Sequence, residues 1–412
     1  MPTGSRSNLS ELATAAREPR RRSRLTRAIG SFRTPWSAVT AVFFAHGFVF
    51  ASWTAHIPHV KEQLALNDGA LGIALLGTPI GSIAAMVIAA RLLPRLGSRP
   101  IVKVTLTGYC VAGPFLGLAR SEAALFIALM AWGAFQGTLD VSMNTQAIAV
   151  ERRAGRTFMP GFHGSWSVGS FAGAAAGAAG VAIGLSLSTQ LLMLGAPCLL
   201  IAGWLTIRML PDARPRPDES PDRVHQRLPR AAWLAIGLLS AIAAADFLCE
   251  GAVADWAAVY LRTSLGAAPA IAALGFTIYL LTMVIVRLSG NWLLARFRAG
   301  KLLPVLTGTA AALFGAALAA SQVALMLIGF AGLGIGIAVV VPVVFSAAGR
   351  VGGMNAGTAV SVVSSSGWAG LVCGPVLIGQ VASVTSLRIA LVLIPVLTAL
   401  IAVSTATSRA LR

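Results

Sequence analysis

Three polar side chains stand at helical spacing inside a strongly apolar stretch of the chain. Gln136, Asp140 and Asn144 are each four residues apart, so a helix over 123–150 carries them on one face. A charged group near the centre of a bilayer costs at least about 2.5–3.5 kcal/mol, so this face is expected to point into a helix bundle. Either solute binding or hydrogen bonding between helices fits the two amides. For Asp140 a functional role, as a proton-coupling residue, is favoured over hydrogen bonding between helices, because a buried carboxylate costs more than an amide.

Two acidic residues lie one helical turn apart in a second apolar segment. Asp246 and Glu250 share a face of the helix expected at 232–261. Two close carboxylates in a low dielectric cannot both ionise cheaply, so one of them is expected to carry a proton near neutral pH. Glu250 is the favoured proton-coupling residue, while Asp246 is a second candidate or the partner of a neighbouring group. His46, in the middle of the helix expected at 36–58, is a further candidate. The alternative for His46 is a neutral packing role.

Other side chains are candidates for the wall of a solute cavity and for an inner gate. Aromatic walls with a few polar groups are typical of small-molecule sites, whereas aromatic belts at the membrane surface are the alternative. The predicted gate residues are His163, Arg95 and Arg99. The aromatic candidates are Trp53, Trp132, Trp166, Trp256, Tyr279 and Trp368.

Metal, cofactor and nucleotide chemistry have no support in the residue spacing. The four cysteines lie inside apolar segments without the spacing of metal ligands, and no histidine pair has a third ligand nearby. The chain also lacks the glycine-rich phosphate loop of ATP-hydrolysing proteins. We therefore expect no metal and no cofactor.

The composition places these residues in a membrane. Of the 412 residues, 56% are hydrophobic and only 11% are charged, and the mean hydropathy is +0.79. A soluble protein of this length would need more charge to cover its surface. The net charge of +18 would suggest nucleic acid in a soluble protein, but here the basic residues come in short groups between apolar runs, which argues against such a partner.

Twelve apolar runs are long enough to cross a bilayer. A twin-arginine export signal is one reading of Arg20–Arg22, but the following run is long enough to span the membrane and is not expected to be a cleaved signal. The predicted spans are 36–58, 70–90, 101–119, 123–150, 160–183, 188–208, 232–261, 268–290, 302–319, 322–346, 355–380 and 389–408.

The basic residues predict the orientation. With an inner N-terminus, the outer side receives Lys61, Arg120, Arg262 and Arg388, and the other 28 of the 32 lysines and arginines fall on the inner side. The inner set includes the four basic residues at 287–301. This bias matches the positive-inside rule, so both termini are expected inside.

The chain is expected to contain two similar halves. A polar connection at 209–230 separates six spans from six, so we expect a basic tail at 1–35, an N-terminal half at 36–208 and a C-terminal half at 231–412. At an offset of 203 residues, Trp53 corresponds to Trp256 and Gly97 to Gly300. Parallel six-helix repeats of this kind occur in the major facilitator fold.

Particular motifs strengthen that resemblance. The stretches Gln136–Asn144, His163–Gly169, Glu250–Trp256 and Val341–Arg350 resemble the major facilitator subgroup around the rhizopine-transport protein MosC and, more distantly, the fucose permeases. The superfamily's loop between helices 2 and 3 has an Asp where this chain has Pro94, and helix 5 lacks the proline of the drug/proton antiporter pattern. The resemblance implies an all-α fold with twelve membrane helices and transport of a small solute.

Together these observations predict a bacterial inner-membrane transporter, monomeric and surrounded by lipid. It is expected to move a small polar or amphipathic organic solute by alternating access, coupled to protons. Export of a hydrophobic metabolite or drug is the alternative within transport. A membrane enzyme is disfavoured, because its loops would need paired acidic motifs and these loops carry arginine. A channel fits the two-half repeat less well.

Overall fold

The described part of the chain contains helices joined by short connections, and no strands, in the computed structural model, which confirms the predicted all-α fold class. The structure describes residues 34–155, 158–211, 230–352 and 356–408. Most of the predicted tail at 1–35 and of the connection at 209–230 therefore lies outside the described residues. The helices are α3 (Pro35–Thr54), α4 (Ile57–Gln63), α5 (Asp68–Leu75), α6 (Gly77–Leu96), α7 (Ser98–Ala112), η1 (Gly113–Leu118), α8 (Glu122–Ala154), α9 (Met159–Ala182), α10 (Leu187–Leu205), η2 (Thr206–Arg208), α11 (Arg230–Val259), η3 (Tyr260–Ser264), α12 (Pro269–Arg296), α13 (Ala299–Ala320), α14 (Val323–Ile337), α15 (Val340–Ala348), α16 (Ala356–Val384), α17 (Leu387–Ala390) and α18 (Leu393–Thr407).

Eleven membrane-crossing candidates are found among the described residues, judged by helix length and composition. The predicted span 160–183 corresponds to α9, which is long but rich in glycine and serine and is not among the eleven. The helix count therefore agrees with the predicted twelve to within one. Several helices start where a side chain caps the first turn, as Asn67 does for α5 and Ser121 for α8.

Some predicted single spans are two helices in the structure. The span 70–90 is divided at Leu76 into α5 and α6, and the span 322–346 is divided at Ala338 and Val339 into α14 and α15. Pro342 explains the second break, because proline has no N–H to donate within a helix. Hydropathy alone did not predict either break, since both sides are equally apolar.

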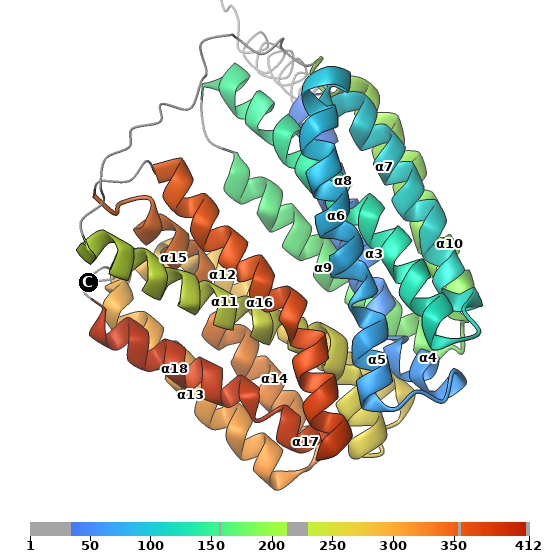
Figure 1. Ribbon diagram of the computed structural model, residues 1–412, viewed down its shortest axis with the longest axis vertical. Coiled ribbons are helices and arrows are strands. Elements are labelled where there is room, and N and C mark those ends of the chain that lie inside the picture. The colour runs from blue at the N-terminus through green and yellow to red at the C-terminus, as the bar shows by residue number, and fades with distance from the viewer. Residues whose placement is uncertain (1–33, 156–157, 212–229, 353–355, 409–412) are drawn as a thin grey trace, which may run out of the picture.

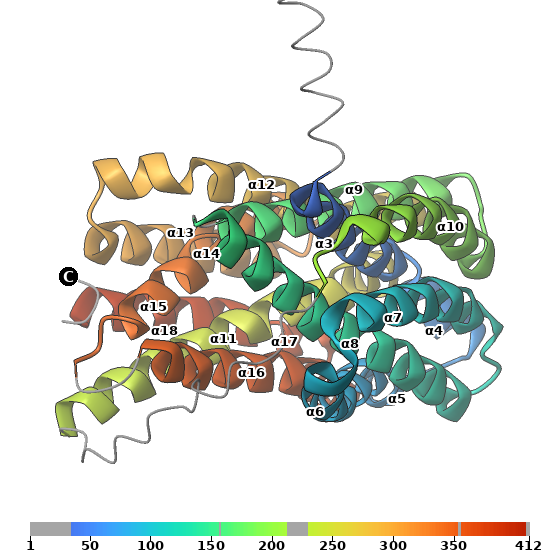
Figure 2. The same cartoon turned by 90° about the horizontal axis from the view of Figure 1, so that it is seen from above.

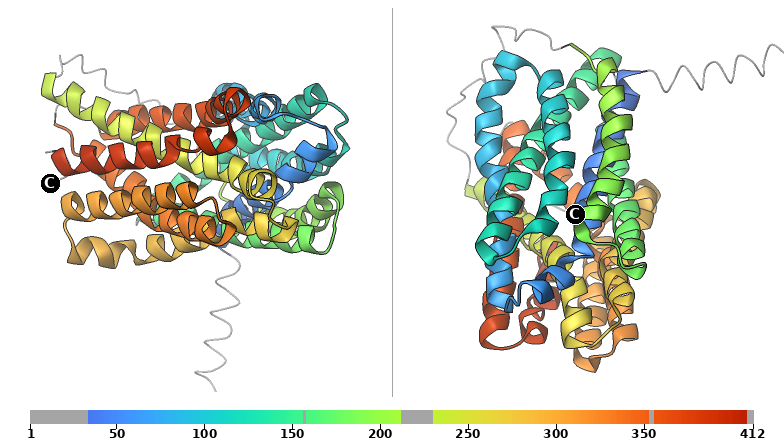
Figure 3. Two further views of the ribbon diagram at one scale, coloured as in Figure 1. Left: turned by 90° about the horizontal axis from the view of Figure 1, so that it is seen from below. Right: turned by 90° about the vertical axis from the view of Figure 1, so that its right-hand side faces the viewer.

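The helices form two groups in space. Figure 1 shows α3 to α10 (blue to green) on one side and α11 to α18 (yellow to red) on the other, and Figures 2 and 3 show the same division from above and below. Within the first group α3 lies against α9, and within the second α11 lies against α16. Glycine permits the first of these contacts, because a Cβ at Gly173 would lie 2.1 Å from the carbonyl oxygen of Phe48.

The two groups touch through α5 with α16 and through α9 with α12. They converge where α5 meets α16 and diverge towards the other end in Figure 1. On the orientation predicted from the basic residues, the touching end faces outwards. Large apolar side chains such as Leu200, Leu288 and Val384 are exposed on the surface, as expected for a chain surrounded by lipid.

Candidate transport site

The polar face of α8 forms a small hydrogen-bonded group. The Asn144 side-chain amide donates to the Asp140 carbonyl oxygen at 2.9 Å and to Asp140 Oδ1 at 3.3 Å. Gln136, one turn before Asp140, has a buried Oε1 with no hydrogen-bond partner in the described part of the chain. The three predicted side chains thus share one face of α8. Asp140 is hydrogen-bonded to Asn144, and the Gln136 Oε1 acceptor has no partner among the described residues.

The two acidic residues of α11 have different surroundings. Glu250 Oε1 accepts a hydrogen bond from the Arg287 guanidinium at 2.7 Å, and both side chains are about a quarter exposed, at 23% and 25%. Asp246 is 0% exposed, and neither of its carboxylate oxygens has a partner among the residues described. A charge on Asp246 would therefore be uncompensated by a direct contact, whereas the charge of Glu250 is paired.

Arg287 is a site residue that the sequence analysis missed. The basic-residue count placed Arg287 with the inner-side residues at 287–301 and gave it no role, although the predicted span 268–290 included it. In the structure Arg287 lies within α12 and binds Glu250. A charged residue inside a span normally has a partner there. The sequence did contain a signal for this pair, because Glu250 in the preceding predicted span is an acidic residue that could have been matched with Arg287.

Arg287 also connects the two helix groups. Its NH1 donates a 3.4 Å hydrogen bond to Ser167 Oγ on α9, and the hydroxyl of Ser167 donates in turn to the His163 carbonyl oxygen at 3.1 Å. The predicted gate residue His163 is exposed on α9, and its ring packs edge-on against Phe43 with centroids 5.4 Å apart. The guanidinium therefore joins α11 and α12 of one group to α9 of the other.

His46 lies in a cluster of aromatic side chains. Trp166 Nε1 donates to His46 Nδ1 at 2.8 Å, and the His46 ring stacks on Tyr109 with centroids 5.5 Å apart. Since Nδ1 accepts a hydrogen bond, the neutral ring carries its proton on Nε2. In the described residues Nε2 has no partner. This geometry suits a neutral packing histidine.

The aromatic candidates divide into two sets. Trp166 and Trp368 are half-buried. Trp132 packs inside the N-terminal group, where its Nε1 donates to the Tyr109 carbonyl oxygen at 3.1 Å. Four of the six are therefore core residues in this conformation, and these are Trp53, Trp132, Trp256 and Tyr279, each at most 2% exposed.

The basic gate candidates lie at the inner ends of α6 and α7. Arg95 is exposed, and Arg99 donates to the Ile207 carbonyl oxygen at 2.8 Å. Gly97, between the two helices, has a φ of +81°, a value that favours glycine. In this conformation Arg99 thus binds η2 of its own helix group.

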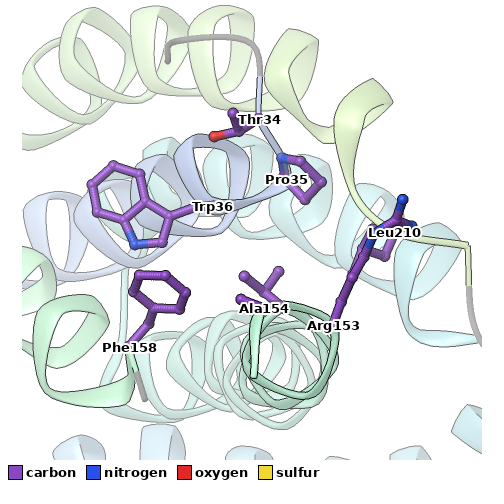
Figure 4. Close-up of a pocket in the computed structure, with 8 residues that line it drawn as sticks. Thr34, Pro35, Trp36, Arg153, Ala154, Phe158 and Leu210 are labelled. Atoms are coloured by element: carbon purple, nitrogen blue, oxygen red, sulfur yellow. The ribbon is translucent and has the colours of Figure 1, made fainter. Parts of the chain in front are cut away.

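A separate pocket lies at the inner end of α3 and α8 (Figure 4). It has a volume of about 480 Å³ and is mainly apolar, with one basic side chain in its wall. None of the predicted site residues lines it. Its lining residues are Thr34, Pro35, Trp36, Val150, Arg153, Ala154, Phe158 and Leu210.

Comparisons with known proteins agree with this architecture. A sequence model described as the Major Facilitator Superfamily matches residues 38–254. An uncharacterized MFS-type transporter of Yersinia pestis is 34% identical over 350 residues, which cover 84% of this chain and 89% of the relative. The membrane protein MosC of Rhizobium meliloti is 29% identical over 87% of this chain and 86% of its own length. The predicted family resemblance is confirmed.

A solved structure supports the fold. A D-xylose-proton symporter superposes with a TM-score of 0.68 over 91% of this chain and 98% of its own, at 15% sequence identity. At that identity the similarity concerns the arrangement of helices alone.

Proposed function

The chain belongs to the major facilitator superfamily, and on that premise we propose that it is a proton-coupled secondary transporter of a small polar or amphipathic organic solute. As a member of that family it is a multi-pass membrane transporter. The proposal adds the coupling ion, the solute class and a location in the bacterial inner membrane. Transport proceeds by rocking of residues 36–208 against residues 231–408 around a site between them.

The observation that carries the proposal is the placement of charged groups inside the membrane helices of both halves. Asp140 lies on α8 in the N-terminal half, and the Glu250–Arg287 pair links α11 and α12 in the C-terminal half. Such groups are costly in a bilayer and are commonly part of solute or proton pathways. Arg287 and Ser167 also bring the pair to the interface between the halves.

Each group has a proposed role. Gln136 and Asn144 bind the solute from one side, with Trp166 and Trp368 as the aromatic walls. Glu250 changes partner between Arg287 and a proton, and Asp140, Asp246 and His46 are further proton sites. A D-xylose-proton symporter with the same fold is an example of such coupling in a related architecture.

Proteoliposomes test the proposal. The purified protein is first screened against a metabolite library by thermal shift, and each ligand found is then tested for accumulation driven by an imposed pH gradient. We expect Asp140→Asn to abolish accumulation, while Glu122→Gln, at the first turn of the same helix, leaves it unchanged. Accumulation that is indifferent to the pH gradient and to a protonophore would exclude proton coupling. Normal accumulation by Asp140→Asn would make Asp140 a structural residue.

A further inference from the structure

Arg287 has one contact that the proposed transport site does not require. Its Nε donates a 3.2 Å hydrogen bond to the carbonyl oxygen of Ala338, at the break between α14 and α15. In an unbroken helix this carbonyl would accept from the N–H four residues later. That residue is Pro342, which has no N–H. Arg287 therefore supplies the donor that the helix itself lacks.

The segments on either side of the break are held by different neighbours. α14 is fitted closely to α12 and α13, since a Cβ at Gly334 would lie 2.3 Å from the Tyr279 carbonyl oxygen and one at Gly336 would lie 2.3 Å from Ala310 Cβ. α15 instead packs against α11 and α16. The break thus separates a segment fixed to α12 and α13 from an inner segment that follows α11 and α16.

The position of the guanidinium depends on Glu250. The bond to the Glu250 carboxylate, at 2.7 Å, is shorter than the bonds to the uncharged acceptors Ala338 O and Ser167 Oγ, at 3.2 and 3.4 Å. Because Glu250 is the only one of the three acceptors that carries a charge, it is the strongest partner of the guanidinium. The other titratable side chains that interact electrostatically with Glu250 or Arg287 are Asp246 and Cys249 on α11, Tyr279 on α12 and His163 on α9. Glu250 is the one that binds the guanidinium directly.

We propose that Arg287 is a positioning residue that sets the angle between α14 and α15 according to whether Glu250 is its partner. While Glu250 holds the guanidinium, Nε of Arg287 donates to the Ala338 carbonyl oxygen, which has no donor within its own helix, and α15 keeps its angle to α14. When Glu250 is neutralised or turns to a solute, the guanidinium leaves Ala338, and α15 bends about Ala338 and Val339. The inference rests on the proposed function in one respect, namely that Glu250 changes partner during transport.

The inference is tested by measuring a distance between α15 and α13, which both belong to the C-terminal half, so that rocking of one half against the other does not affect the result. Spin labels are placed on exposed positions of α15 and α13 through Ser346→Cys and Val305→Cys, in a protein whose Cys198 and Cys373 are replaced by serine. Because both labels are in the C-terminal half, movement of one half against the other leaves their separation unchanged. The control pair joins Val305 to Val403 on α18, which packs against α13.

We expect Glu250→Gln to shift or broaden the distance between positions 346 and 305 by a few ångströms, with no change in the control pair. Arg287→Lys should have the same effect, because an ammonium lacks the rigid fork that reaches two acceptors. Pro342→Ala restores an N–H for the Ala338 carbonyl and should suppress the effect of Glu250→Gln. Pro197→Ala, a proline inside α10, is the matched control and should not suppress it.

Two results overturn the inference: an unchanged distance in Glu250→Gln, or a shift that Pro342→Ala fails to suppress. Both concern variants that keep Arg287, so the test stands even if Arg287→Lys does not fold. Proton-driven accumulation in the same variants separates this inference from the proposed function. A distance shift in a protein whose transport ignores protons rejects the coupling alone, whereas proton-coupled transport with no distance shift rejects the role of Arg287 alone.

Discussion

Two of the contacts between the halves differ in their chemistry. At the predicted outer end, α5 and α16 approach through glycine, since a Cβ at Gly72 would lie 2.7 Å from the Pro375 carbonyl oxygen. Between α9 and α12 the contact includes a guanidinium, that of Arg287, which reaches Ser167 while holding Glu250. The first contact is a fit of backbone shapes, and the second depends on charge.

This difference separates two requirements of a carrier. A close contact at glycine is disrupted by any added side chain, but its stability does not depend on protonation or on a charged ligand. A guanidinium contact tolerates small changes of shape but responds when its anion is neutralised or replaced. We therefore expect substitutions at the outer contact to change whether the halves close, and substitutions around Arg287 to change what controls closure.

Gly72→Ala is expected to have the largest effect. The new Cβ meets backbone atoms of Pro375 and Gly379, which cannot rotate away, and overpacking of this kind costs about 1–3 kcal/mol. The outer end should open, and transport should fall about tenfold, since about 1.4 kcal/mol corresponds to a factor of ten. Cysteine labelling of outer positions measures the opening. Gly164→Ala is the control, because nothing lies within 4 Å of the added Cβ there, and equal behaviour of the two variants would contradict a glycine contact.

Glu250→Gln and Asp246→Asn should differ in their effect on stability. Glu250→Gln leaves Arg287 without its anion, and we expect a loss of about 1–3 kcal/mol, less than for a fully buried pair because both partners are about a quarter exposed. Asp246→Asn removes a carboxylate that has no direct partner in the described chain, so its cost should stay below about 1 kcal/mol. Thermal unfolding in detergent at pH 7 compares them. A larger loss for Asp246→Asn would show that Asp246 is the paired acid.

The ion pair at the outer end should contribute little. Arg262 Nε lies 3.0 Å from Glu62 Oε1, and the two side chains are 33% and 46% exposed. Exposed pairs contribute about 0–1 kcal/mol, so Glu62→Gln should change transport by less than about fivefold. Added salt should have a similarly small effect on the wild-type protein. A tenfold loss in Glu62→Gln would mean that charge, and not glycine, holds the outer end closed.

The smallest effect is expected from His56, which supports the outer end of the N-terminal half. Its Nε2 donates to Gln190 Oε1 at 2.9 Å. Burial lowers the pKa of His56 below its usual value of 6.5, with an opposing contribution from the Gln190 bond and a further lowering by His59. Because the unfolded chain binds the proton more readily, stability should be complete above about pH 6.5 and should decline as the pH falls below it.

Unfolding midpoints at pH 7.5 and 5.5 measure this decline. His56→Gln should reduce it, while His59→Gln, an exposed neighbour, should reduce it less. An unchanged decline in His56→Gln would assign the pH dependence to other groups.

Much of this protein could be predicted from its sequence, because the deciding signals are local. Length and hydropathy of each run predicted the helices, and the distribution of lysine and arginine predicted which ends face inwards. Spacing along one helix predicted the shared face of Gln136, Asp140 and Asn144, and the bonds between Asn144 and Asp140 lie within a single turn. The family was also predictable, because its motifs are short and contiguous.

Tertiary structure alone decided which acidic residue is paired. Arg287 is 37 residues from Glu250 and 120 from Ser167, and the choice between Glu250 and Asp246 depends on how α11 rotates against α12. The same holds for Trp132 and Trp256, whose burial follows from neighbouring helices, and for the Ala338 carbonyl, whose donor comes from another helix. Periodicity fixes the face of a helix on which a residue lies, but the partner across that face is set by packing between helices that are distant in sequence.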